Sequence, residues 1–119
     1  MLFRGVKPLK IDVLGAKYDL RTVPKGKDPY LEDCDGYCDY TTKQIVVIDY
    51  KSGTVGEIKN DSFYVKQIKR HEIIHAFFFE SGLGANWEHK PFGQEETTVD
   101  WIARQFPKML EAFKAADAL

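Results

Sequence analysis

The chain has 119 residues, of which 44% are hydrophobic and 13% aromatic, so it is long enough to bury a core of its own. With 17 basic and 18 acidic residues the net charge is -1, and no basic stripe indicates a nucleic-acid surface. No apolar run could span a membrane, and residues 1–8 are too polar for a signal peptide. We therefore expect one cytoplasmic domain over residues 1–119, without nucleic-acid or membrane partners. Cys34 and Cys38 are then expected to be reduced thiols.

The first half of the chain predicts a small antiparallel sheet of three to four strands, built from two β-hairpins. Residues 9–13 alternate apolar and polar side chains, and residues 18–22 resume the alternation after a turn, which indicates the first hairpin. Residues 36–40 and 44–50 have the pattern of a second hairpin. The apolar run at 45–48 predicts that its last strand is buried on both faces.

Two helices are predicted after the sheet. The first covers about residues 63–80, with a capping side chain at 60–62 and Gly82 suited to the left-handed position at its end. This helix is apolar on nearly all sides, which predicts that it is buried. The second begins near Gln94, carries an apolar stripe on one side, and must be kinked or restarted at Pro107. The predicted fold is therefore of the α+β class, with the sheet packed on a buried helix and a C-terminal helix.

The first helix contains the motif H-E-x-x-H. His71 and His75 are one turn apart on one helix face, so both imidazoles can reach one metal ion. Glu72 lies beside that face, where it can hold a water molecule bound to the same ion. Because unpaired polar groups are unfavourable in a buried helix, a metal would satisfy all three side chains. The motif favours a zinc site over the alternative, a helix with ordinary partly buried polar residues.

A catalytic zinc usually has three protein ligands and keeps a fourth position for water, so a ligand is needed after His75. Glu96 is favoured because it falls in the first turn of the last helix, on the side expected to face the core. Asp100 lies one turn later and can accept the spare ring N–H of a ligating histidine. Glu95 is rotated off this face and is expected to be a solvent-facing charge. His89, in an irregular segment, is the alternative third ligand.

The motif H-E-x-x-H, followed after 20 residues by E-x-x-x-D, is similar to the gluzincin pattern of thermolysin-like peptidases. In that family the glutamate is the third zinc ligand and the aspartate supports the first histidine, which implies these roles for Glu96 and Asp100. The length and the order of strands before helices look like the small ImmA/IrrE-type metallopeptidases of phages and mobile elements. This resemblance implies a minimal zincin-like fold, and a narrow protein target such as a repressor or regulatory protein.

The resulting functional prediction is a zinc-dependent peptidase. The zinc ion would activate a water molecule, and Glu72 would carry a proton from this water to the leaving amine. His89 is the first candidate for stabilising the oxyanion, with Tyr64 and Tyr40 as alternatives. An extended peptide substrate would add to a sheet edge. Residues 44–50 are the first edge to test, although their apolar run could equally form a central strand. The alternative function is a non-catalytic zinc-binding structural or interaction module, which would not need Glu72.

Overall fold

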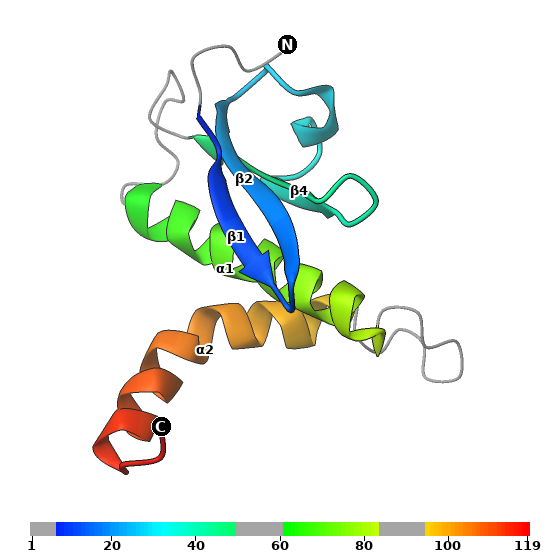
Figure 1. Ribbon diagram of the computed structural model, residues 1–119. Coiled ribbons are helices and arrows are strands. Elements are labelled where there is room, and N and C mark those ends of the chain that lie inside the picture. Colours follow the sequence, from blue (N-terminus) through cyan, green and yellow to red (C-terminus); the bar gives the residue numbers. More distant parts are fainter. Residues whose placement is uncertain (1–6, 50–60, 84–94) are drawn as a thin grey trace.

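The computed structural model describes residues 7–49, 61–83 and 95–119, and it shows one sheet with two long helices on one side of it (Figure 1). The elements in chain order are β1 (Leu9–Val13), β2 (Ala16–Pro24), a short 3-10 helix η1 (Pro29–Leu31), β3 (Gly36–Asp39), β4 (Gln44–Asp49), α1 (Asp61–Ser81) and α2 (Glu96–Ala115). The predicted α+β class is confirmed.

The sheet has four strands in the order β1-β2-β4-β3. Both predicted hairpins are present, since β1 pairs with β2 and β3 pairs with β4 in antiparallel fashion. The prediction of a wholly antiparallel sheet is wrong, because β2 and β4 run parallel, with Leu20 beside Ile45. The chain between them goes through η1 and β3, and β3 takes the outer position. β4 is therefore central, which was the alternative for residues 44–50, and their first assignment as the edge strand is wrong. Among the described residues, β3 is an edge strand with no strand on its outer side.

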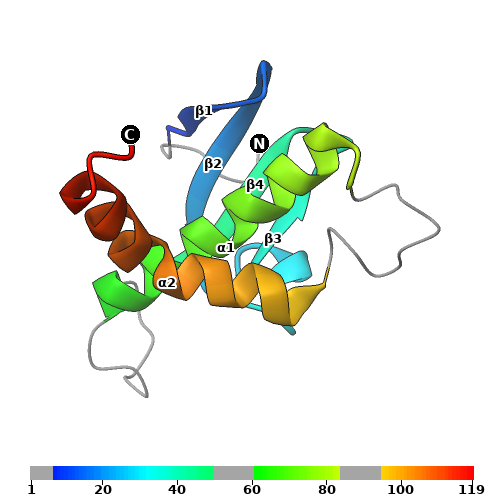
Figure 2. The same ribbon diagram turned by 90° about the horizontal axis from the view of Figure 1, so that it is seen from below.

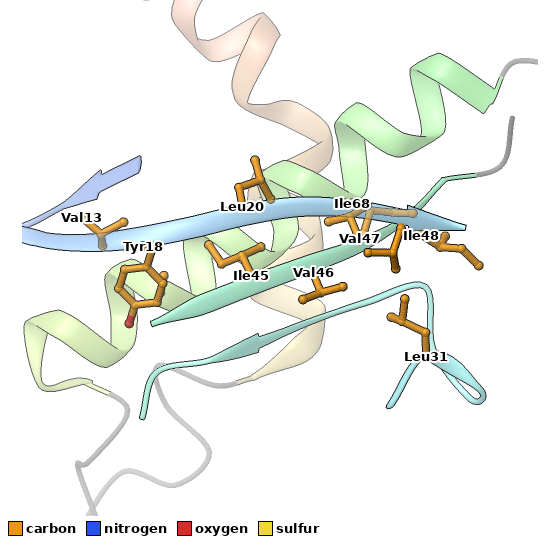
Figure 3. Close-up of a cluster of buried hydrophobic side chains, with 11 residues drawn as sticks. Val13, Tyr18, Leu20, Leu31, Ile45, Val46, Val47, Ile48 and Ile68 are labelled. Atoms are coloured by element: carbon orange, nitrogen blue, oxygen red, sulfur yellow. The ribbon is translucent and has the colours of Figure 1, made fainter. Parts of the chain in front are cut away.

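The core lies between the sheet and α1 and continues around β4. Gly36 of β3 faces Ile68 of α1. Because Gly36 pairs with Val47, and paired residues share one face of the sheet, Val47 lies on the face of β4 that is turned toward the helix. Val46 and Ile48 alternate to the opposite face, and Leu31 of η1 belongs to the same buried cluster (Figure 3). All four apolar residues of β4 are buried, which confirms the prediction that this strand is covered on both faces.

α1 is one-sided, and the prediction of a helix buried nearly all round is wrong. Its buried residues form a single face: Gln67, Ile68, Glu72, His75 and Ala76. Phe63 and Phe77 are exposed among the described residues, because the sheet and the first part of α2 cover only part of the helix surface. The helix ends as predicted, with Gly82 in the left-handed region at a φ of 91°.

α2 crosses α1 with its first half and then turns away (Figures 1 and 2). Val99 and Ala103 are buried, and the Arg70 Nε of α1 donates a hydrogen bond to the Ala103 carbonyl at 2.6 Å. The helix continues through Pro107, beyond which its side chains are half-buried or exposed. The predicted core-facing stripe is therefore wrong beyond Ala103. In the described ranges, neither helix is long and apolar enough to cross a membrane.

Candidate metal centre

Three side chains from the two long helices converge at one point. The Nε2 atoms of His71 and His75, one turn apart on α1, each lie 2.9 Å from the Oε1 atom of Glu96. Glu96 is the first residue of α2, and the three potential ligand atoms lie within 4.8 Å of one another. The structure thus brings together the three predicted metal ligands, which are separated by up to 25 positions in the sequence. The Glu96 side chain is 71% exposed, so the expectation that it faces the core is wrong, although its carboxylate reaches both histidines.

The surroundings of His71 are better suited to a metal-bound imidazole than to a free neutral one. Its Nε2 faces Glu96 at 2.9 Å and its Nδ1 faces the Oδ1 atom of Asp100 at 3.2 Å. A neutral imidazole has only one N–H, so one of these contacts would set a nitrogen lone pair against a carboxylate oxygen. With a cation at Nε2, the proton is at Nδ1 and donates to Asp100, and both contacts become favourable.

Asp100 is held in place from its other side. Its Oδ2 atom accepts a hydrogen bond from Arg104 Nε at 2.6 Å, one turn further along α2. This hydrogen bond lowers the pKa of the Asp100 carboxyl, so the side chain remains an anion that can accept from His71. The chain Arg104–Asp100–His71 therefore fixes the orientation of the imidazole.

Replacing Asp100 with asparagine is expected to weaken zinc binding by about 10–100-fold, because the support of the His71 ring is lost. The affinity can be measured by competition with a chromophoric chelator. Asp117→Asn, an exposed change of the same kind at the end of the chain, should leave the affinity unchanged. An unchanged affinity for Asp100→Asn would show that Asp100 does not orient a ligand.

A cavity of about 260 Å³ lies beside the three converging side chains. It is lined from the two helices by His71, Glu72 and Glu96, from β3 by Gly36, and from the preceding loop by Cys34. Glu72 is buried and forms no hydrogen bond with any of the described residues. Burial raises the pKa of its carboxyl, against the opposing attraction of His71 and His75. A carboxylate with a raised pKa and no fixed partner is suited to proton transfer in this cavity.

The carboxyl group of Glu96 is more strongly ionised than that of Glu72. Burial acts to raise its pKa, but hydrogen bonds and attraction from His75 and His71 outweigh this effect and lower the pKa. The two glutamates therefore differ in the way that their predicted roles would require. Glu96, the predicted ligand, stays charged, and Glu72, the predicted base, is easier to protonate.

Gly36 is a site residue that sequence reasoning missed. A Cβ atom at this position would lie 2.8 Å from Ile68 Cγ2 and 3.3 Å from Glu72 Cγ. The absence of a side chain therefore lets β3 approach α1 closely at the glutamate of the motif. A glycine inside a predicted strand is a signal of such a close approach, although the sequence does not say which element approaches.

The Gly36→Ala variant is expected to lose about 1–3 kcal/mol of folding stability, because the added methyl group collides with the stiff Ile68 side chain. In an Ile68→Ala background, where Cγ2 is absent, the same change should have a much smaller effect. Urea unfolding of the four proteins in this double-mutant cycle measures the coupling. Equal losses in both backgrounds would contradict the close contact.

The other predicted catalytic residues have different outcomes. Tyr64 lines the same cavity, and its hydroxyl donates a hydrogen bond to Asp35. Tyr40 lies elsewhere and stacks on Phe79, with ring centroids 4.4 Å apart, so it cannot serve this cavity. His89 lies outside the described residues.

Two further glutamates on the long helices and their caps, Glu80 and Glu95, have structural contacts. Glu80 accepts hydrogen bonds from Tyr18 and Lys43, which tie the end of α1 to the sheet. Glu95 is the N-cap of α2, and its carboxylate accepts from the backbone N–H groups of Thr97 and Thr98. This cap fixes where α2 begins and so places Glu96 at the histidines.

The two imidazole nitrogens and the carboxylate oxygen form a donor set that zinc accepts. Cys34 and Cys38 are free thiols, and neither belongs to the converging group. Comparisons of the chain with protein-family models, curated proteins and solved structures found no match in any of the three. The geometry of this centre is therefore the basis for proposing a function.

Proposed function

We propose that the chain is a zinc-dependent peptidase with a minimal zincin-like arrangement, in which His71, His75 and Glu96 hold the metal. One observation carries the proposal: these three side chains converge beside a cavity lined by Glu72, a buried residue whose carboxylate has no hydrogen-bond partner among the described residues. Structural zinc sites usually have four protein ligands, whereas three converge here among the described residues. A three-ligand centre with an adjacent carboxylate supports catalysis rather than a purely structural role.

A bound zinc ion supplies Lewis-acid chemistry, since it lowers the pKa of a water molecule and polarises a carbonyl group. Glu72 accepts the proton of the attacking water on its carboxylate and delivers it to the nitrogen of the leaving amine. Glu72 lines the cavity beside His71 and Glu96, so its carboxylate is placed to take up a proton there and release it again. Asp100 holds the His71 ring through Nδ1, which keeps Nε2 turned toward the centre.

The outer edge of β3, which pairs with no other strand in the described part of the chain, is the place where an extended substrate would pair. The Ile48 N–H of β4 donates to the Asp35 carbonyl at 2.9 Å, and the antiparallel alternation then turns the backbone groups of Gly36 and Cys38 outward. Because Gly36 also lines the metal cavity, a peptide added to β3 would pass beside Glu72. The resemblance noted in the sequence adds a repressor or regulatory protein as the target.

Zinc-dependent cleavage of a complex peptide mixture tests the proposal. Zinc-loaded protein should generate new peptide termini, detected by mass spectrometry, from a tryptic digest of a whole proteome. A chelator should stop the reaction and added zinc should restore it. Tight zinc binding without any cleavage would instead support the non-catalytic zinc-binding module.

A further inference from the structure

A second hollow lies along the C-terminal part of β3, outside the metal centre. It has a volume of about 540 Å³, within the range of roughly 300–1,000 Å³ typical of ligand pockets. We call it the aromatic groove, and its main lining residues are Tyr30, Tyr37, Cys38, Tyr40, Val46 and Phe79. The rings are arranged in pairs: Tyr30 and Tyr37 meet edge to face at 5.8 Å between centroids, and Tyr40 stacks on Phe79.

The aromatic groove and the metal cavity share one strand. Asp35 and Gly36 line the cavity, and the residues that follow them along β3, from Tyr37 to Tyr40, line the groove. At about 3.3 Å per residue, Gly36 and Asp39 at the two ends of β3 are roughly 10 Å apart, and Tyr40 follows directly after the strand. An extended chain paired with the free edge of β3 at the metal centre would therefore continue directly over the groove.

The segment that forms this edge is strongly acidic. Residues 28–40 contain no lysine or arginine, and they contain the five acidic residues Asp28, Glu32, Asp33, Asp35 and Asp39. Glu32 and Asp33 are exposed, and neither forms an ion pair with a described residue. At the metal cavity the Asp100 carboxylate is paired with Arg104, which lines the same cavity, so the excess negative charge of this edge lies in residues 28–40. An approaching cationic chain would be attracted to this segment, and an acidic chain would be repelled.

We propose that the aromatic groove is a specificity subsite, which takes an apolar side chain of an extended, cationic peptide bound along β3. This proposal rests on the proposed function, in which the same edge carries the substrate. An aromatic side chain gains most from the groove, because it can pack edge to face or offset-stacked against the four rings. Lysine or arginine residues beside it meet the acidic segment and the exposed ring faces.

Binding of a defined probe tests the groove. The probe is a short fluorescein-labelled peptide in which lysine and threonine alternate around one central phenylalanine. Its affinity is measured by fluorescence anisotropy on zinc-loaded protein carrying Glu72→Gln, so that the probe is not cleaved. Replacing Tyr40, which is 46% exposed, with alanine should weaken binding about tenfold. Phe113→Ala, which truncates a ring that is 40% exposed on α2, should change binding less than twofold and serves as the matched control.

A second probe, with serine in place of the phenylalanine, completes a double-mutant cycle between Tyr40 of the protein and the phenylalanine of the probe. It should bind the parent protein about tenfold more weakly, and Tyr40→Ala should have little further effect on it. Equal binding of the two probes, or an equal loss for both on Tyr40→Ala, would overturn the subsite. Circular dichroism of each variant confirms that the fold is retained.

The charge preference has its own test. The double variant Glu32→Gln/Asp33→Asn should weaken binding of the lysine probe several-fold at low salt and reduce its salt dependence. Glu111→Gln, an exposed change on α2, should do neither. A glutamate-for-lysine probe that binds as tightly as the original would overturn the cationic preference.

The results separate this proposal from the proposed function. If the protein cleaves the peptide digest in a zinc-dependent way, but Tyr40→Ala and the two probes show no difference, the subsite fails and the peptidase stands. If the probes are discriminated as expected but nothing is cleaved, the peptidase fails and the groove stands as a peptide-binding site.

Discussion

The Glu72→Gln variant is expected to bind zinc as tightly as the unaltered protein and to lose about 10²–10⁴-fold in the rate of peptide cleavage. The substitution preserves size and removes only the ability to take up and release a proton. Glu72 is buried in the cavity beside His71 and Glu96, and no described residue competes for its carboxylate. Elemental analysis of the zinc content and a measurement of the cleavage rate, both made on the same preparation, separate an effect on metal binding from an effect on catalysis.

Glu80→Gln is the matched control for this experiment. Glu80 lies on the same helix, but its carboxylate contacts Tyr18 and Lys43 and lies outside the cavity. This variant should cleave at close to the normal rate. Persistence of cleavage in Glu72→Gln would exclude Glu72 as the base, and loss of zinc from that variant would mean that Glu72 is a ligand.

Replacing Glu96 with alanine should lower the zinc affinity more than about 100-fold, since even residues that only support a ligand typically contribute 10–100-fold. The variant loses the oxygen on which both histidine Nε2 atoms converge. Zinc should also stop raising the melting temperature, because a ligand stabilises a fold only in proportion to its binding. Competition titration and thermal unfolding with and without zinc measure both effects.

The neighbouring glutamate provides the control. Glu95 caps α2, so Glu95→Ser is preferable to alanine because serine can also accept hydrogen bonds from the first turn. This variant should keep its zinc affinity and its zinc-dependent stabilisation. If Glu95→Ser loses the metal and Glu96→Ala keeps it, the assignment of the third ligand is wrong.

The elements that depend on local pattern could be predicted from the sequence. The alternation before and after residues 14–15 predicts the first hairpin, and Gly82 predicts the end of α1. The position that would cap the start of α1 lies outside the described residues. The parallel pairing of β2 with β4 could not be predicted, because it depends on how two hairpins meet. The exposure of Phe77 was missed for a related reason, since the apolar composition of a helix does not show which faces its neighbours cover.

In the site, too, the features set by local sequence pattern could be predicted and those set by packing could not. Helical spacing places His71 beside His75, and Glu96 and Asp100 on one side of α2, without any knowledge of the packing. The angle between the two helices, which brings Glu96 to the histidines, depends on contacts such as Arg70 with Ala103. The role of Gly36 was hidden because its contacts with α1 are with residues distant in the sequence.

X-ray absorption at the zinc edge, on protein with a measured zinc content, tests the central claim most directly. The predicted result is about one zinc per chain, with nitrogen and oxygen neighbours at about 2.0–2.2 Å and an imidazole signal from His71 and His75. The Glu96→Ala variant should then have lost most of its zinc. A sulfur neighbour at about 2.3 Å, from Cys34 or Cys38, would contradict the account, as would a protein that does not retain zinc.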